Sequence, residues 1–332
     1  MSSTAAESRL TAAIEAVTRA ARATRRIQSQ LTVIRQLVKE DRSPVTTADY
    51  AAQALVIATL CQHLGEVRLI GEEESRSLRE PENAALRRAV VEAVGAEMPS
   101  LDEEAVLGYI DQGSHDGSAG SYWTLDPVDG TKGFLRGGQY AISLALVEEG
   151  ELRLGVLGCP ALPVDPGRPL DRPDPVGTLF HASRGGGAWS RPLEGAEDAR
   201  LPLIRDDGRS PLRICESVES GHSRHDLSAR VVEALGGLPP LRLDSQCKYG
   251  VVARGQAHAY LRLPTRPGYV ERVWDHAAGV LVATEAGMRV SDIDGRPLDF
   301  GHGALLSANR GVVCSVPRFH GPLVEAIARL MA

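Results

Sequence analysis

The hydrophobic pattern of this chain changes once along its length, and that change constrains the fold more than any other feature. Residues 140–193 alternate apolar and polar side chains in two predicted β-hairpins, which a proline-rich loop separates. From Leu212 onwards, short apolar strands alternate with helices, as in an α/β layer. At roughly 150 residues per domain, the 332 residues suffice for two domains. We therefore predict an α+β domain over residues 1–208 and an α/β domain over residues 209–332.

The composition excludes several classes of protein. The chain has 37 Lys and Arg against 43 Asp and Glu, a net charge of −6, and only 4% aromatic residues. It therefore lacks the basic field and the stacking surfaces that a nucleic acid polymer needs. No apolar run approaches the ~20 residues that span a bilayer, so we expect no membrane partner. The five cysteines are far apart and never form a C-x-x-C pair, which predicts a reduced, cytoplasmic protein, although the Arg-rich residues 19–35 leave organellar targeting open.

The segment WTLDPVDGTKGF carries the strongest chemical signal in the sequence. Asp126 and Asp129 lie three residues apart across a proline turn where a predicted strand ends, so both carboxylates and the Val128 carbonyl can face one point. Such a set of oxygen atoms is typical of a site for a hard cation. Gly130 and Thr131 are predicted to open a short helix, whose free N–H groups suit a phosphate oxygen. The segment thus combines metal ligands with a phosphate-binding turn.

Four further acidic residues lie at the ends of predicted elements, namely Asp49, Glu72, Glu73 and Asp275. If they converge on the DPVD pair, each pair of carboxylates at about 4 Å repels by roughly 4 kcal/mol at an effective dielectric constant of 20, so cations must neutralise them. Oxygen ligands without paired cysteine or histidine favour Mg²⁺ or Mn²⁺ over zinc. Spacing alone does not bring such remote residues together. Taken singly, Asp126 and Asp129 are ordinary turn formers, Asp49 is a first-turn carboxylate and Asp275 is a helix N-cap.

Three short motifs resemble the signatures of the lithium-sensitive, Mg²⁺-dependent phosphatase superfamily of inositol monophosphatase: GEE at 71–73, DPVDGT at 126–131 and WDHAAG at 274–279. Longer segments, among them SPVTTADYAAQ, LDSQCKYGVVARG and YLRLP, resemble more narrowly the 3'(2'),5'-bisphosphate nucleotidase family. The resemblance covers roughly residues 41–320. It implies a layered α-β-α-β-α sugar-phosphatase-like fold.

The resemblance also implies which residues bind two or three Mg²⁺ ions and activate water. The expected ligands are Glu72, Asp126 and the Val128 carbonyl for the first ion, Asp126, Asp129 and Asp275 for the second, and Asp49, Glu72 or Glu73 for a weaker third. Asp49 and Thr131 are expected to orient and deprotonate the attacking water. In-line displacement without a covalent intermediate follows from this arrangement.

The substrate implied by the resemblance is 3'-phosphoadenosine 5'-phosphate, whose 3'-phosphate is removed to give AMP. The residues expected to contact it are Gly130, Thr131, His222, Ser245, Lys248, Arg262 and Asp275. Lysine and arginine suit the retained 5'-phosphate, and an arginine in the alternating strand AYLRLP needs an anionic partner. Without the resemblance, His222 is a solvated loop histidine, and Arg262 pairs with Glu271 or Asp244 instead.

Alternative functions stay open at this point. The 5'-phosphosulfate relative of the nucleotide is a second candidate substrate. An inositol phosphatase, acting on a mono- or polyphosphate, is the nearest rival, and the monophosphatase would not need a second phosphate pocket. A non-catalytic sensor of nucleotide and cation is a rival of another class, although all expected catalytic residues are present. We expect a monomer that acts on a small molecule.

Overall fold

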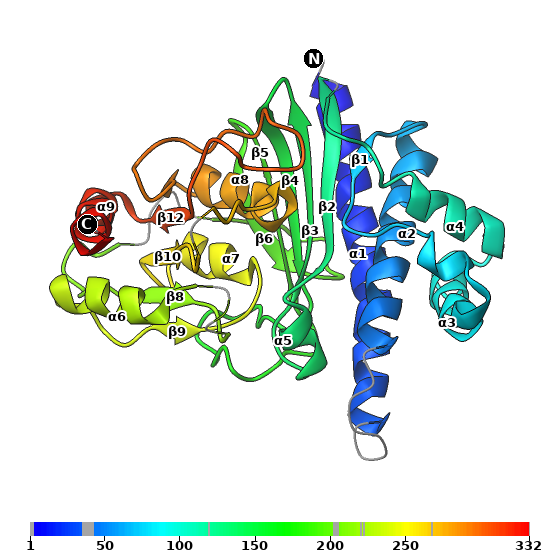
Figure 1. The fold of residues 1–332 in the computed structure, drawn as a ribbon, viewed down its shortest axis with the longest axis horizontal. Coiled ribbons are helices and arrows are strands. Elements are labelled where there is room, and N and C mark those ends of the chain that lie inside the picture. Colours follow the sequence, from blue (N-terminus) through cyan, green and yellow to red (C-terminus); the bar gives the residue numbers. More distant parts are fainter. Residues whose placement is uncertain are drawn as a thin grey trace.

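The described part of the chain folds into two sheets separated and flanked by helices (Figure 1). The computed structural model describes residues 3–34, 43–118, 120–201, 206–219, 221, 223–266 and 268–331. None of the helices in these ranges is long and apolar enough to cross a membrane.

The first sheet has seven strands that follow one another in chain order within the described residues. They are β1 (Leu69–Ile70), β2 (Ser121–Asp129), β3 (Ala141–Glu148), β4 (Glu151–Cys159), β5 (Thr178–Ser183), β6 (Gly187–Pro192) and β7 (Ala199–Arg200). β1 pairs with β2 in parallel, and every later strand pairs antiparallel with the one before it. The two hairpins predicted from the alternating pattern are therefore confirmed.

The second sheet is mixed and has the strand order β11-β12-β10-β8-β9. Its strands are β8 (Ile214–Glu216), β9 (Leu241–Arg242), β10 (Ala259–Arg262), β11 (Arg289–Ser291) and β12 (Val312–Ser315). β8 pairs in parallel with both β9 and β10, whereas β12 is antiparallel to β10 and β11. The predicted boundary near residue 208 falls between the last strand of one sheet and the first strand of the other. The division into two domains stays a prediction.

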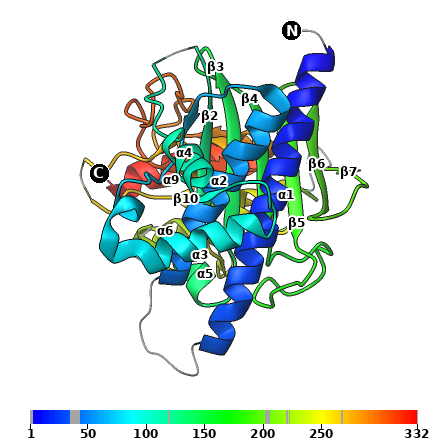
Figure 2. The same cartoon turned by 90° about the vertical axis from the view of Figure 1, so that its right-hand side faces the viewer.

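The helices complete an α-β-α-β-α layer order, which confirms the predicted fold class. α1 (Ser3–Ile34) and α2 (Ser43–Leu64) cover the outer face of the first sheet, with α3 (Ala84–Gly95) and α4 (Glu103–Asp111) outside them (Figure 2). α7 (Cys247–Ala253) and α8 (Ala277–Glu285) lie between the sheets, and α6 (His225–Ala234) and α9 (Pro317–Met331) lie beyond the second. Short 3₁₀ turns occur at Ser77–Arg79, Pro81–Asn83 and Val273–Asp275 (η1, η2, η3).

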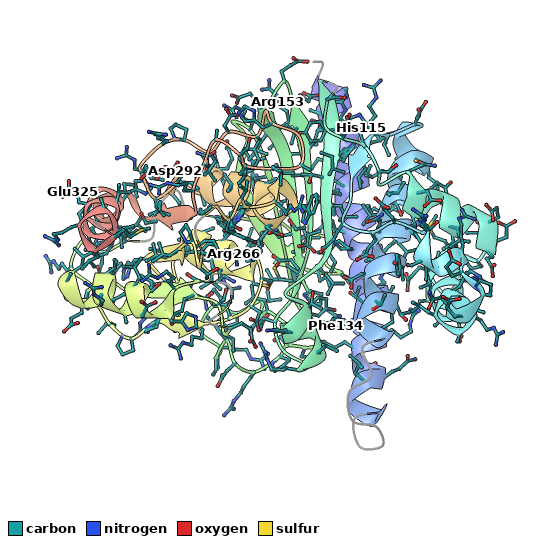
Figure 3. All side chains as sticks on the ribbon, viewed as in Figure 1. His115, Phe134, Arg153, Arg266, Asp292 and Glu325 are labelled. Carbon is teal, nitrogen blue, oxygen red and sulfur yellow. The ribbon has the colours of Figure 1, made fainter. Side chains whose placement is uncertain are left out.

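Helices that are apolar on all sides occupy the interior of this arrangement. α8 has the sequence AAGVLVATE, and its residues Ala277–Ala283 are all buried. A helix without a polar face has to be covered all round, and α8 packs against the first sheet on one side and α7 on another. The short α5 (Thr131–Leu135) closes the end of β2 and buries Phe134 against Tyr140, with ring centroids 5.0 Å apart (Figure 3). The packed core therefore holds the end of β2 and the N-terminal end of α8 in place, and the functional side chains project from these two ends.

Gly155 in β4 tests how closely α8 packs on the first sheet. A Cβ atom at this position would lie 2.9 Å from the backbone oxygen of Ala278 and 3.2 Å from its Cα. Because backbone atoms cannot move aside cheaply, Gly155→Ala should lower the free energy of unfolding by about 1–3 kcal/mol. Gly108→Ala, in α4 with open space at the Cβ position, should be neutral or stabilise by up to about 1 kcal/mol. Urea denaturation measures both, and a Gly155→Ala protein as stable as wild type would contradict this packing.

Candidate active site

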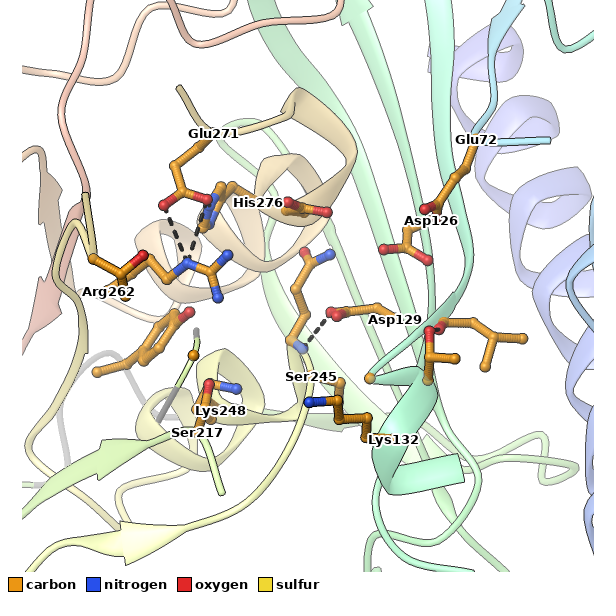
Figure 4. A pocket seen from close by; sticks show the side chains of 18 of the residues that line it. Glu72, Asp126, Asp129, Lys132, Ser217, Ser245, Lys248, Arg262, Glu271 and His276 are labelled. Carbon is orange, nitrogen blue, oxygen red and sulfur yellow. Dashed lines mark hydrogen bonds and ion pairs between the residues drawn. The ribbon is translucent and has the colours of Figure 1, made fainter. Parts of the chain in front are cut away.

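A cavity of about 810 Å³ lies between two parts of the structure (Figure 4). The end of β2 and α5 form one side, and α7 and β10 form the other. Most of the residues predicted to form the site line the cavity: Glu72, Asp126, Val128, Asp129, Gly130, Thr131, Ser245, Lys248, Arg262 and Asp275. Two other predicted residues, Asp49 and Glu73, are not among the residues that line it, but the charges of Glu72 and Glu73 act on Asp49. His222 lies outside the described residues. The structure thus gathers side chains that are up to about two hundred residues apart in sequence.

A β-bulge explains how Asp126 and Asp129 face the same cavity. The expected end of the strand at Asp126 is wrong, because β2 continues to Asp129. Asp126 pairs with Ser143 and Asp129 with Ala141, so three steps on β2 match two on β3. In a regular strand, residues three apart point to opposite faces, and one extra residue cancels this alternation. The Pro-Val pair between the two aspartates therefore sits in a bulge that directs both carboxylates inward.

Glycine is required at position 130 because the residues just before α7 approach this turn closely. It has a φ of 88°, and a Cβ atom there would lie 3.0 Å from the Cβ of Ser245 and 3.3 Å from that of Asp244. Ser245 itself has a φ of 68°, a left-handed conformation that is uncommon outside glycine, and its Oγ accepts a hydrogen bond from the N–H of Cys247 at 3.1 Å. The turn after β2 and the start of α7 therefore touch across the cavity.

Burial and mutual repulsion disfavour the charged forms of the acids in this cavity. Asp126 is 4% exposed, and burial together with the charges of Glu72, Asp129 and Asp275 raises its pKa well above its ordinary value. Burial and the neighbouring charges of Glu73 and Asp129 raise the pKa of Glu72 to about 7. Burial also raises the pKa of Asp275 to about 7. The carboxylates are thus close enough for their charges to act on one another.

The pKa values of Asp49 and Asp129 are both raised, but different neighbours act on the two carboxylates. Burial, followed by the charges of Glu73 and Glu72, raises the pKa of Asp49. Burial raises the pKa of Asp129 too, but Lys248 and the N–H of Gln246, which donates to its Oδ2 at 2.6 Å, oppose the rise. Asp129 is therefore the carboxylate that links the acidic wall to the cationic one.

The residues present fit divalent cations. Among the described residues, no group donates a hydrogen bond to the buried Oδ1 of Asp126, which leaves a ligand atom without a partner. The surrounding donors are oxygen atoms, and a cation would relieve the repulsion that raises their pKa values. Glu271, Asp275 and His276 offer ligand atoms within 4.8 Å of one another, whereas no three of the predicted carboxylate ligands come that close in the described part of the chain. The individual ligand roles stay predictions.

The opposite wall of the cavity is cationic. Lys248 is 2% exposed, and its Nζ donates to the Leu243 carbonyl at 3.3 Å and lies 5.1 Å from the centroid of the Tyr260 ring. Burial lowers the pKa of Lys248, while the charge of Asp129 opposes that shift. Arg262, at the end of β10, donates from Nε to both oxygens of Glu271 at 3.1 and 3.3 Å. The pairing of Arg262 with Glu271, considered above as an alternative to nucleotide contact, therefore exists. It leaves Nη1 of Arg262 for a ligand, while Nη2 lies 3.5 Å from the hydroxyl of Tyr269.

Gln246 is a residue of the site that the sequence did not single out. Its N–H binds Asp129, its Nε2 donates to the Trp274 carbonyl at 2.8 Å, and its Oε1 accepts from the N–H of Gly279 at 3.0 Å. It thereby ties the end of β2 to the segment that carries Asp275. Its position between two predicted contact residues, Ser245 and Lys248, was the one signal available.

Comparison with known proteins places this geometry in a family. The model of the inositol monophosphatase family matches residues 4–331. The chain belongs to the inositol monophosphatase family. Its fold agrees with that of solved structures: Mycobacterium tuberculosis SuhB superposes with a TM-score of 0.61 at 22% identity over 97% of this chain and 96% of that one. CysQ from Bacteroides thetaiotaomicron, a bacterial member of the family, gives 0.60 at 22% identity over 92% and 96%.

Within the inositol monophosphatase family, the chain has relatives of much higher identity. A protein from Emericella nidulans named 3'(2'),5'-bisphosphate nucleotidase is 41% identical over 318 residues, which cover 88% of this chain and 90% of that protein. Proteins of the same name from Schizosaccharomyces pombe and Oryza sativa are each 40% identical and cover 95% and 96% of this chain, and 94% and 93% of their own. Membership of the family makes the site a metal-dependent one.

The raised pKa values predict how stability depends on pH and metal. Glu72 and Asp275 have pKa values of about 7 in the folded state, above the ordinary 4.5 and 3.8, so folding favours their protonated forms. Without metal, the protein should lose stability as the pH rises from 5 to 8, because these groups must ionise next to one another. Saturating Mg²⁺ replaces the protons and should raise the melting temperature by about 5 °C at pH 8, and by less at pH 5. Thermal unfolding at both pH values measures this.

The Glu72→Gln variant is the control for this pH dependence. It removes one of the groups whose pKa is raised, and should show a smaller loss of stability between pH 5 and 8 in the absence of metal. A metal-free wild-type protein that becomes more stable over the same pH range would contradict the electrostatic account of the site.

Proposed function

We propose that this protein is a Mg²⁺-dependent 3'(2'),5'-bisphosphate nucleotidase, which removes the 3'-phosphate of 3'-phosphoadenosine 5'-phosphate and releases AMP. One observation carries the proposal: a single cavity has an acidic wall and, opposite it, two cations, the buried Lys248 and the largely buried Arg262, whose side chain is 14% exposed. The acidic wall suits metal ions at a phosphate to be cleaved. The two cations suit a second phosphate that is retained. The relatives that bear this name support the same activity.

The acidic wall supports hydrolysis by an activated water. Bound Mg²⁺ supplies Lewis acidity, which lowers the pKa of the water and screens the charge on the leaving oxygen. We assign the ligand roles to Glu72, Glu73, Asp126, the Val128 carbonyl, Asp129 and Asp275. Asp49, whose raised pKa suits a general base, and Thr131, whose Oγ1 lies 3.5 Å from the Val128 carbonyl, would orient the water and take its proton. The backbone N–H groups of Gly130 and Thr131 would hold the oxygens of the cleaved phosphate.

The cationic wall supports recognition of the remaining parts of the substrate. Lys248 and Arg262 would bind the 5'-phosphate, and Ser245 would contact the ribose. His222, which lies outside the described residues, is proposed for the nucleoside by resemblance alone. The 5'-phosphosulfate relative also carries an anionic group at this position, so it is a second candidate substrate. Inhibition by lithium, tested at fixed Mg²⁺, is a further expectation from the resemblance.

Substrate preference tests the proposal against its nearest rival, an inositol monophosphatase. A phosphate held by these two cations contributes charge-assisted hydrogen bonds that a monophosphate substrate cannot make. We expect kcat/KM to be about 100-fold higher for adenosine 3',5'-bisphosphate than for inositol 1-phosphate. Phosphate release at saturating Mg²⁺ measures both values. Better hydrolysis of inositol 1-phosphate would overturn the nucleotidase assignment.

Phosphate release by an Asp49 variant tests whether this site is catalytic, as in an enzyme, or belongs to a non-catalytic sensor. Asp49→Asn removes the proposed base but keeps the shape of the side chain, so phosphate release should fall by about 10²–10⁴-fold. Stabilisation by Mg²⁺ should persist, because the other ligands remain. Asp171→Asn, at an exposed aspartate of the proline-rich loop outside the cavity, is the matched control and should be fully active. Unchanged turnover in Asp49→Asn would remove Asp49 from the mechanism.

A further inference from the structure

Glu271 forms a buried ion pair with Arg262 at the cationic wall. The side chains of Arg262 and Glu271 are 14% and 4% exposed. The Nε of Arg262 donates to both carboxylate oxygens, and its Nη2 lies 3.5 Å from the hydroxyl of Tyr269. Because Glu271 occupies the inner nitrogen of the guanidinium, the two terminal nitrogens point into the cavity, as Figure 4 shows.

A second set of buried groups holds Glu271 from behind. The Nε2 of His276 lies 3.3 Å from Oε2 of Glu271, and Nδ1 of His276 lies 2.8 Å from the hydroxyl of Tyr249. An ionised carboxylate can only accept a hydrogen bond, so Nε2 of His276 donates to Glu271. The Glu271 carbonyl also accepts from the N–H of Leu306 at 2.9 Å. Glu271 is thereby fixed in one orientation.

Glu271 stays charged in spite of its burial. Burial alone would raise its pKa, but the hydrogen bond and charge of His276 and the charge of Arg262 hold the pKa at about 2. The other anions whose charges act on Arg262 include Asp275 and Asp129, both predicted metal ligands. A guanidinium released from Glu271 would be drawn to those carboxylates. The ion pair therefore keeps Arg262 directed at the cavity and away from the metal-binding acids.

We propose that Glu271 is a positioning residue that fixes Arg262 for the phosphate that is not cleaved, and thereby sets the preference for bisphosphates over monophosphates. The inference rests on the proposed nucleotidase function. It also accounts for the close grouping of Glu271, Asp275 and His276: Glu271 pairs with Arg262, His276 contacts Glu271, and Asp275 alone remains for a cation.

Glu271→Gln tests this role by comparing two substrates. Adenosine 3',5'-bisphosphate carries the retained phosphate and adenosine 3'-monophosphate lacks it, so only the first depends on a fixed Arg262. At saturating Mg²⁺, Glu271→Gln should raise KM for the bisphosphate about tenfold and change its kcat by less than about twofold. KM for the monophosphate should not change. Inhibition by AMP, which keeps the 5'-phosphate, should weaken by the same tenfold factor.

Glu216→Gln is a matched control. The carboxylate of Glu216 is 2% exposed and accepts from Nε of Arg242 at 2.9 Å, but it does not line the cavity. This variant also removes the charge of a buried glutamate paired with an arginine, here the 56% exposed Arg242, and should leave both KM values unchanged. Should Glu271→Gln fail to fold, Glu271→Asp keeps the charge and should still raise KM for the bisphosphate alone.

The outcomes separate the positioning role from the proposed function. The wild-type protein decides the function by itself, since a lack of activity on the bisphosphate removes the nucleotidase assignment whatever the variants do. If the wild type prefers the bisphosphate, equal losses on both substrates in the Glu271 variants, or no loss on either, would overturn the positioning role.

Discussion

Repulsion among carboxylates gathered at one cavity is the constraint on which the rest of this structure depends. Glu72, Asp126, Asp129 and Asp275 come from different parts of the chain, and burial raises the pKa of each. Such a group is stable only where the surrounding core is strong enough to hold it or where cations neutralise it. The bulged β2 and the apolar helices α2 and α8 supply that support. Membership of the inositol monophosphatase family agrees with a site built around metal ions.

The second constraint is the separation of charge within one cavity. The acidic wall comes mainly from the first sheet. The cationic wall comes from α7, which lies between the sheets, and from β10 of the second sheet. Two contacts hold the side chains of the walls in position: the N–H of Gln246 donates to Asp129 on the acidic wall, and Glu271 accepts from Arg262 on the cationic wall. A protein with a net charge of −6 can thus bind a polyanionic ligand, because its cations are placed locally.

The sequence predicted the fold better than it predicted the contacts of the site. Alternation and turn residues were enough for the hairpins, because a period of two is a direct consequence of strand geometry. Pro127 was interpreted as the end of a strand, whereas the structure uses it inside a bulge, which local patterns do not distinguish. The meeting of Asp49, Glu72, Asp126 and Asp275 depends on tertiary packing, so only the resemblance to a family supplied it. The contacts of Gln246 with Asp129 and of His276 with Glu271 were not predicted, because they exist only in the folded chain.

Metal binding tests the central claim most directly. Crystals of the protein soaked with Mn²⁺, AMP and inorganic phosphate would reveal the cations by anomalous scattering. The account predicts at least two peaks within ligand distance, about 2.0–2.4 Å, of oxygen atoms from Glu72, Asp126, Asp129 and Asp275, with the phosphate of AMP beside Lys248 and Arg262. A soaked crystal in which these four carboxylates bind no cation would contradict it.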